Sequence, residues 1–133
     1  MNQFFYLSAF CILTLAACKG GFKKAGNGLE YKIISVGSGD KPVYGDYIQM
    51  HIKNIYNGIK DTVLGDTHES MPKIQMFDSA RTPLEYFKIM SQLRIGDSVV
   101  IKVLTDSAFA KAPNGMPAFI KKGKYIYTYI KLV

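Results

Sequence analysis

Residues 82–104 read TPLEYFKIMSQLRIGDSVVIKVL, and their pattern changes from that of a helix to that of a strand at Gly96. In the first half, apolar side chains recur at spacings of three and four residues, which predicts one short helix over 83–93. These side chains are Tyr86, Ile89, Met90 and Leu93. Thr82 and Glu85 have the types and spacing of a capping box, with a proline directly after the threonine. We expect the apolar face of this helix to pack on a core first of all.

The chain from Leu29 onward otherwise shows the alternation of strands separated by turn residues. The run of β-branched residues over Ser98–Leu104 predicts a strand in the middle of a sheet, and Asn57-Gly58 predicts a tight hairpin turn. The expected strands are Leu29–Val36, Asp46–Tyr56, Ile59–Leu64, Lys73–Phe77, Ser98–Leu104 and Lys124–Val133. Together they predict an α+β domain in which an antiparallel β-sheet wraps around one short α-helix, with loops over Gly65–Met71 and Thr105–Gly123.

Composition excludes several classes of function. The chain has 133 residues, a formal net charge of +7 and two cysteines, Cys11 and Cys18. Both cysteines precede the expected domain, which excludes disulfides, thiol catalysis and cysteine-based metal sites within it. The histidines, His51 and His68, fall in a strand and a loop without the spacing of metal ligands, so we expect no metal site. The lysines are spread thinly and accompany no aromatic–basic motif, so nucleic acid is not an expected partner.

The N-terminus carries an apolar run over Phe4–Ala17 that is too short to span a bilayer as a helix. Its small residues at the end predict a secretory signal peptide over 1–17, although no Lys or Arg precedes the run. The ending Leu15-Ala16-Ala17-Cys18 resembles the lipobox of bacterial lipoproteins, in which the chain is cut before the cysteine. The alternative is a buried N-terminal helix in a cytosolic protein.

The lipobox resemblance implies that Cys18 is lipidated and attaches the protein to a membrane outside the cytoplasm. Residues 18–28 would then hold the lipidated cysteine and a flexible tether, because they are rich in glycine and lysine. Residues 29–133 would form the folded domain. By analogy with known lipoproteins, we expect a lipid-anchored protein of the cell envelope, on the outer membrane and facing the periplasm.

The order of the elements and the residues at their joints resemble the FKBP-type peptidyl-prolyl isomerases over Gly28–Val133. The most similar part is Tyr86–Ile101, which resembles that family's tryptophan-led helix, its Leu/Met-x-x-Gly turn and the strand that follows. Asn57–Thr62 stands in place of the family's Asp-Gly-x-x-Phe-Asp-Ser, and Thr105–Phe109 in place of its Pro-Asp-x-Ala-Tyr-Gly. The resemblance implies an FKBP-like fold for the domain.

This resemblance also implies a non-covalent isomerase that needs no cofactor and no metal. An apolar pocket favours the twisted X–Pro amide, because the planar amide places charge on its carbonyl oxygen. Three residues take the positions of the family's catalytic groups. Tyr86 replaces the floor tryptophan, Asp61 the carboxylate and Phe109 the loop tyrosine. The implied substrates are proline-containing segments of exported proteins.

The pocket walls depart from the family in ways that leave a second function open. Ile52 stands where a wall tyrosine is usual and Lys60 where a wall phenylalanine is usual; Ile74 and Met76 are expected on the side wall. Phe109 also lacks the hydroxyl that donates to the substrate in the family. The alternative function is therefore a catalytically weak or silent FKBP-like binding or assembly module of the cell envelope.

Two residues of the candidate site also have a purely structural interpretation. Asp61 is as well suited to capping the hairpin, and Phe109 to anchoring its loop, as to contacting a ligand. A third hypothesis is a small β-rich lipoprotein unrelated to the family. The sequence does not determine the oligomeric state.

Overall fold

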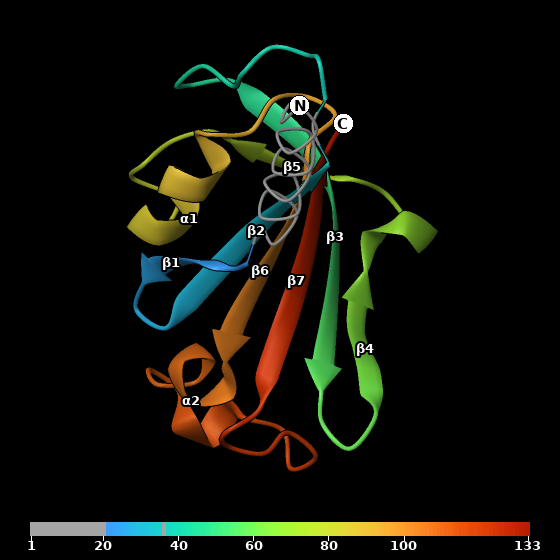
Figure 1. Cartoon of the computed structure of the whole chain (residues 1–133), viewed down its shortest axis with the longest axis vertical. Coiled ribbons are helices and arrows are strands. Elements are labelled where there is room, and N and C mark those ends of the chain that lie inside the picture. The colour runs from blue at the N-terminus through green and yellow to red at the C-terminus, as the bar shows by residue number, and fades with distance from the viewer. Residues whose placement is uncertain (1–20, 36) are drawn as a thin grey trace, which may run out of the picture.

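An antiparallel sheet dominates the computed structural model, which describes residues 21–35 and 37–133 (Figure 1). Within these residues the sheet has seven strands. They are β1 (Lys23–Gly26), β2 (Leu29–Ser35), β3 (Tyr47–Asn57), β4 (Asp61–Asp66), β5 (Lys73–Met76), β6 (Ser98–Leu104) and β7 (Tyr125–Leu132). The helices are α1 (Leu84–Met90) and the single turn α2 (Thr105–Ala108), with 3₁₀ turns at Thr67–Glu69 and Pro113–Gly115. This arrangement confirms the predicted α+β class.

The strand order is β1-β2-β6-β7-β3-β4, with β5 paired to the other end of β3, and every pair is antiparallel. β6 lies between β2 and β7, as its β-branched sequence predicted. The long β3 exceeds β4 and β5 in length, which allows it to pair with both of them along one edge. Helix α1 lies beside the sheet, near β1 and β5, in Figure 1.

The core lies between α1 and one face of the sheet. Ile89 and Leu93 from the helical segment are almost fully buried, as are Val99 and Ile101 of β6 and Leu132 of β7. Alternate residues of β6 face this core because successive side chains of a strand point to opposite faces. Each fully buried aliphatic side chain stabilises the fold by roughly 1.5–3 kcal/mol. The apolar periodicity in the sequence therefore identified the correct helix face.

The buried carboxylate of Asp97 joins the loop after β2 to the segment that follows α1. Asp97 is 3% exposed. It accepts hydrogen bonds from the backbone N–H groups of Gly37 and of Arg94, the latter at 2.8 Å. A side chain at Gly37 would clash with the carbonyl oxygen of Ile95. Gly37 thus permits the close backbone approach that Asp97 stabilises.

The prediction of a capping box at the start of the helix is wrong. Helix α1 begins at Leu84 after Pro83, and no side chain caps it. The hydroxyl of Thr82 instead accepts a hydrogen bond from Gln75 at 2.9 Å, and the Glu85 carboxylate accepts one from Asn27 at 2.6 Å. Both side chains are thus engaged in contacts with other segments, which the local sequence pattern does not reveal.

The helix also ends earlier than predicted, at Met90 instead of residue 93. Gln92 and Leu93 donate their backbone N–H groups to the residues three positions before them, Ile89 and Met90. The last turn is therefore tightened into 3₁₀-type geometry, although Leu93 remains in the core.

Part of the expected tether is ordered. Lys23–Gly26 forms β1, which pairs with β2 through a turn whose residues Gly26, Asn27 and Gly28 all have positive φ. The free edge of β2 supplies hydrogen-bonding partners for this segment, an interaction that composition alone does not predict. Residues 1–17 and Cys18 lie outside the described residues, and so does the start of the tether.

Two further elements differ from the predicted boundaries. The return strand of the hairpin covers Asp61–Asp66 instead of Ile59–Leu64, because Ile59 lies fully exposed in the turn. The expected loop over 105–123 contains α2 and a 3₁₀ turn. No helix in the described part of the chain is long and apolar enough to cross a membrane.

Candidate functional site

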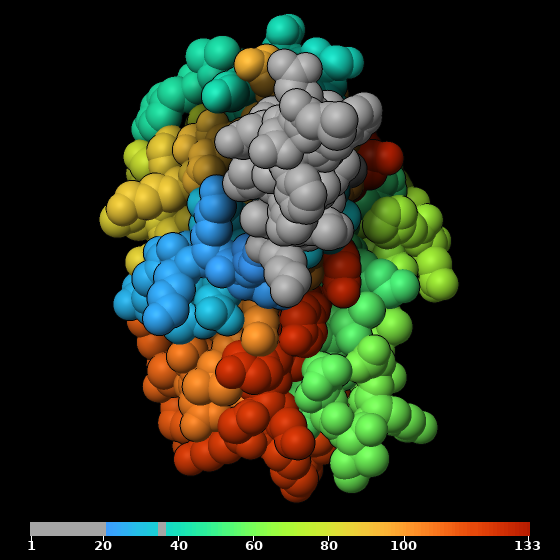
Figure 2. Space-filling view, in the orientation of Figure 1, coloured from blue at the N-terminus to red at the C-terminus, as the bar shows by residue number. Residues whose placement is uncertain are grey.

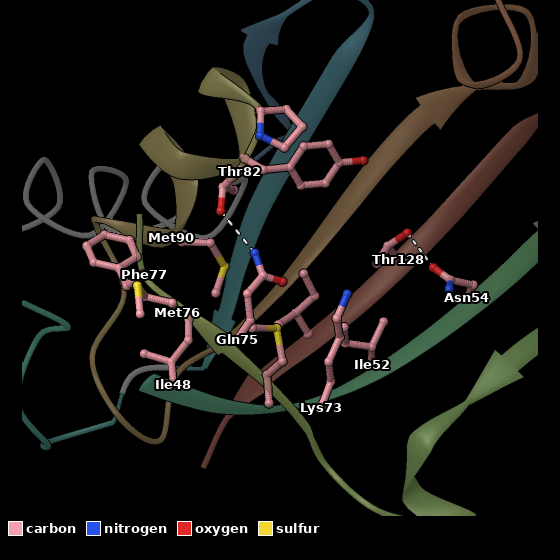
Figure 3. A pocket seen from close by; sticks show the side chains of 14 residues that line it. Ile48, Ile52, Asn54, Lys73, Gln75, Met76, Phe77, Thr82, Met90 and Thr128 are labelled. Atoms are coloured by element: carbon pink, nitrogen blue, oxygen red, sulfur yellow. Dashed lines mark hydrogen bonds between the residues drawn. The ribbon is translucent and has the colours of Figure 1, made fainter. Parts of the chain in front are cut away.

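A cavity of about 310 Å³ opens between α1, β5 and the core-facing side of β3 and β7 (Figure 3). Its lining is mostly apolar, with a few polar groups. The residues are Ile48, Met50, Ile52, Asn54, Lys73, Gln75, Met76, Phe77, Thr82, Pro83, Tyr86, Met90, Thr128 and Ile130. A small apolar cavity with few polar groups is the usual form of a ligand site.

Tyr86 contributes one of the two aromatic rings of this cavity, and Phe77 contributes the other. Tyr86 lies in the first turns of α1, half-buried against the core. Burial, with a smaller contribution from the neighbouring Glu85 carboxylate, raises the pKa of the Tyr86 phenol above its ordinary value. Its hydroxyl forms no hydrogen bond with the described part of the chain.

Two hydrogen bonds orient the polar groups of the cavity (Figure 3). The Gln75 amide donates to the Thr82 hydroxyl at 2.9 Å. The Thr128 hydroxyl donates to the Asn54 side-chain oxygen at 2.7 Å. Each bond engages one end of a side-chain carboxamide. The carbonyl oxygen of Gln75 and the NH₂ group of Asn54 are not used in these bonds. An oxygen can accept from a peptide N–H, and an NH₂ group can donate to a peptide carbonyl.

The structure brings three of the predicted site residues into this one cavity: Tyr86, Ile52 and Met76. Ile74 lies outside it and is 58% exposed. The neighbours of Ile74 on β5, Lys73 and Gln75, line the cavity instead. A shift of one residue along a strand moves a side chain to the opposite face, which explains why the assignment missed Gln75.

Asp61 does not line this cavity. It opens β4 at the base of the hairpin, exposed to solvent, and accepts a hydrogen bond from the Asn57 side chain at 3.0 Å. This contact spans the hairpin turn, which is the structural role that the sequence left open as an alternative. Lys60 is likewise exposed in the turn and not part of the cavity wall.

Phe109 also lies apart from the cavity. It follows α2, packs partly buried against the core, and lines a separate cavity of about 160 Å³. That smaller cavity is formed by the α2 segment and the loop after it, including Thr105 and Met116. Phe109 thus anchors its own loop in this structure.

Sequence reasoning missed three polar groups of the cavity, Asn54, Gln75 and Thr128. A signal for two of them was present: Asn54 is two residues from Ile52 on β3, and Thr128 is two residues from Ile130 on β7. Residues two apart on a strand share a face. Gln75 required the register of β5, which only the pairing with β3 supplies.

The two histidines are closer than their separation in sequence suggested. The rings of His51 and His68 stack with their centroids 4.4 Å apart. Asp66 accepts hydrogen bonds from the backbone N–H and the ring of His68, which lower the pKa of the Asp66 carboxyl. The cluster lies where β4 ends in the 3₁₀ turn Thr67–Glu69, beside β3, and contributes nothing to the cavity.

Solved structures with the same architecture were found by comparison of the fold. FkpA from Escherichia coli is 16% identical with a TM-score of 0.61, and the match covers 89% of this chain and 53% of that one. A multi-domain immunophilin from Arabidopsis thaliana is 14% identical with a TM-score of 0.62, over 86% of this chain and 45% of that one. The fold of this domain is FKBP-like. The N-terminal domain of FKBP42 from Arabidopsis thaliana is 15% identical with a TM-score of 0.60, over 84% of this chain and 89% of that one.

This FKBP-like chain spans about half the length of the first two proteins. No protein-family model matches its sequence, and no curated protein does either. The likeness is therefore one of fold.

Proposed function

We propose that this protein is an FKBP-like peptidyl-prolyl cis-trans isomerase that binds proline-containing segments of exported proteins. The observation that carries the proposal is the cavity between α1 and the sheet, with Tyr86, Ile52 and Met76 in its lining. Its volume of about 310 Å³ is at the lower end of the range for ligand pockets and suits a prolyl ring with part of the adjoining residue.

The proposed chemistry is non-covalent. Rotation about an X–Pro bond is slow, with a barrier of roughly 20 kcal/mol, because the planar amide is stabilised by resonance. An apolar cavity solvates the polarised planar amide poorly and the twisted amide comparatively well, which lowers the barrier. No acid, base or nucleophile is required for this step.

Asn54 and Gln75 take the role of orienting the peptide in this proposal. Their free carboxamide ends offer one donor and one acceptor at the cavity, and Thr128 and Thr82 hold them in place. A peptide bound through both groups would present its X–Pro bond near the ring of Tyr86. Asp61 and Phe109 act on the hairpin and the loop instead of on the substrate.

The proposal includes a lipid anchor at Cys18, based on the sequence before it. Two or three acyl chains, at roughly 0.8 kcal/mol for each buried methylene, hold a protein stably on a membrane. An isomerase attached in this way, on the outer membrane and facing the periplasm, would meet exported proteins as they pass.

A second candidate function is a binding module without measurable isomerase activity. It is favoured by the positions of Asp61 and Phe109, which leave the cavity without a carboxylate and without the loop aromatic ring that the family resemblance implied. Such a module would hold an envelope partner in the same cavity.

The exchange rate of X–Pro peptides in the presence of residues 19–133 tests the proposal. We expect the rate to rise in proportion to protein concentration. Tyr86→Ala should abolish this acceleration, whereas Tyr129→Ala, a tyrosine on the other face of the sheet, should retain it. No acceleration by a folded domain that still binds the peptides would instead establish the binding module.

A further inference from the structure

The face of the sheet opposite the cavity is the feature from which a further inference follows. On β7, Thr128 and Ile130 line the cavity, so Tyr127, Tyr129 and Lys131 project to the other side. The strand register places further side chains on that side: Lys102 pairs with Tyr127, and Lys32 lies across Val100 from Tyr129. We call this surface the outer face and define it by Lys32, Lys102, Tyr127, Tyr129 and Lys131.

The outer face combines aromatic rings with cations. Tyr129 is 39% exposed, and the Lys102 ammonium lies 4.2 Å from the centre of the Tyr125 ring. Lys32 and Lys131 are exposed and form no ion pair with any described residue. Tyrosine rings and lysine ammonium groups are the side chains that favour the headgroup region of an anionic membrane. Figure 2 shows the C-terminal part of the chain (red) at the surface between the N-terminal strands (blue) and β3 and β4 (green).

The described chain begins on this same face. The ring of Phe22 packs edge-on against the ring of Tyr127, with centroids 6.4 Å apart, and the Lys102 ammonium lies 5.6 Å from the Phe22 ring. Four residue steps separate Phe22 from Cys18. Even a fully extended chain covers only about 14 Å over that distance. A lipid on Cys18 would therefore hold the outer face within reach of the headgroups.

We infer that the outer face docks on an anionic membrane surface. This inference rests on the proposed lipidation of Cys18 and goes beyond it, because an anchor alone leaves the orientation of the domain open. Docking brings Lys32 and Lys131 to the lipid phosphates and Tyr129 to the headgroup layer. The cavity, on the opposite side of the sheet, then faces away from the membrane and stays open to exported proteins.

A fluorescent probe on each side of the sheet tests this orientation in the lipidated full-chain product. Ile34, next to the outer face, is 54% exposed, and Leu84, on α1 at the cavity side of the sheet, is 57% exposed. Ile34→Cys and Leu84→Cys therefore form a matched pair. Each labelled protein is reconstituted in phosphatidylcholine vesicles with and without phosphatidylglycerol, and quenching by spin-labelled lipids is measured.

We expect the probe at position 34 to be quenched several-fold more strongly than the probe at position 84, and only with phosphatidylglycerol present. Each lysine at an anionic surface changes the equilibrium constant for docking by about fivefold, so Lys32→Glu with Lys131→Glu should lower that constant by about 25-fold or more. Lys88→Glu with Lys111→Glu, two exposed lysines outside the outer face, should leave quenching unchanged.

The outcomes separate this inference from the proposal it rests on. A purified protein without the mass of the acyl chains would overturn the anchor and the docking together. An acylated protein with equal quenching at positions 34 and 84 would overturn docking alone. Shielding of the probe at position 34 from aqueous reagents without lipid quenching would indicate a protein partner on the outer face, which also contradicts the inference. The peptide exchange assay is independent of all three.

Discussion

Replacing the ring of Tyr86 separates the role of the cavity from the stability of the fold. Full removal of a buried aromatic ring costs roughly 3–5 kcal/mol, and the ring of Tyr86 is half-buried, so we expect Tyr86→Ala to lower the free energy of unfolding by about 2 kcal/mol. Tyr86→Phe should change it by less than about 0.5 kcal/mol. The hydroxyl it removes forms no hydrogen bond with any described residue, and burial raises the pKa of the phenol further above the neutral range.

The same variants should behave differently in an exchange assay with X–Pro peptides. Tyr86→Phe keeps the apolar ring and should retain the isomerase rate within about twofold. Tyr86→Ala should lose at least about tenfold, which corresponds to roughly 1.4 kcal/mol of transition-state stabilisation. Urea unfolding of each variant shows how much of the protein is folded under the assay conditions.

A control with matched stability makes this prediction refutable. Val103 is buried in β6 and does not line the cavity, and Val103→Ala should also cost about 2 kcal/mol. An equal loss of activity in Val103→Ala and Tyr86→Ala would show that stability, and not the aromatic ring, limits the rate. A fully active Tyr86→Ala would refute the assignment of the cavity as the site.

Four further outcomes follow from individual contacts. Asp97→Asn keeps the shape of the side chain but can accept only one of the two backbone N–H hydrogen bonds that the carboxylate accepts. The free energy of unfolding should therefore fall by about 2–3 kcal/mol, seen as a lower urea midpoint with an unchanged slope. Thr128→Val removes the hydrogen bond that orients Asn54; it should cost about 1 kcal/mol and weaken peptide binding measured by calorimetry. Phe109→Tyr should leave the exchange rate unchanged, because position 109 lines a separate cavity; a faster rate would place it in the site. The lowered pKa of Asp66 gives stability that is present above its ordinary pKa and lost as the pH falls through the depressed value; Asp66→Asn should remove that part of the acid dependence in unfolding titrations.

Local sequence patterns were sufficient to predict an element where the burial of its own side chains determines its structure. The run of β-branched residues over Ser98–Leu104 matches the bounds of β6 residue for residue. The apolar spacing from Tyr86 to Leu93 identified the buried side of the helical segment. Both predictions depend only on which side chains must leave water, a property of each residue and its near neighbours.

Predictions failed where a side chain had two possible partners. Thr82 and Glu85 have the chemistry of a capping box, but Gln75 and Asn27 engage them instead. The sequence separation between Asn27 and Glu85 is 58 residues, so no local pattern could reveal this contact. In the same way, β1 forms because β2 offers it an unpaired edge.

The candidate site shows the same division. The resemblance assigned Tyr86, Ile52 and Met76 to one site, and all three line one cavity, while their roles in binding and catalysis stay predictions. Asp61 and Phe109 were carried over by the same resemblance and lie elsewhere. Sequence similarity indicated which helix and strands form the cavity. It did not indicate whether residues next to turns and loops, such as Asp61 and Phe109, reach that cavity.

By itself the sequence determined the α+β class, the helix with its buried face, most of the strands and the expectation of a lipid anchor at Cys18, because burial periodicity and short motifs are local properties. Only the tertiary structure decided the register of β5, the pairing of β1, and the meeting of Asn54, Gln75 and Thr128 around one cavity. These features arise from hydrogen bonds and packing between segments distant in the chain. Their energies depend on how the strands align, and alignment is a property of the whole sheet.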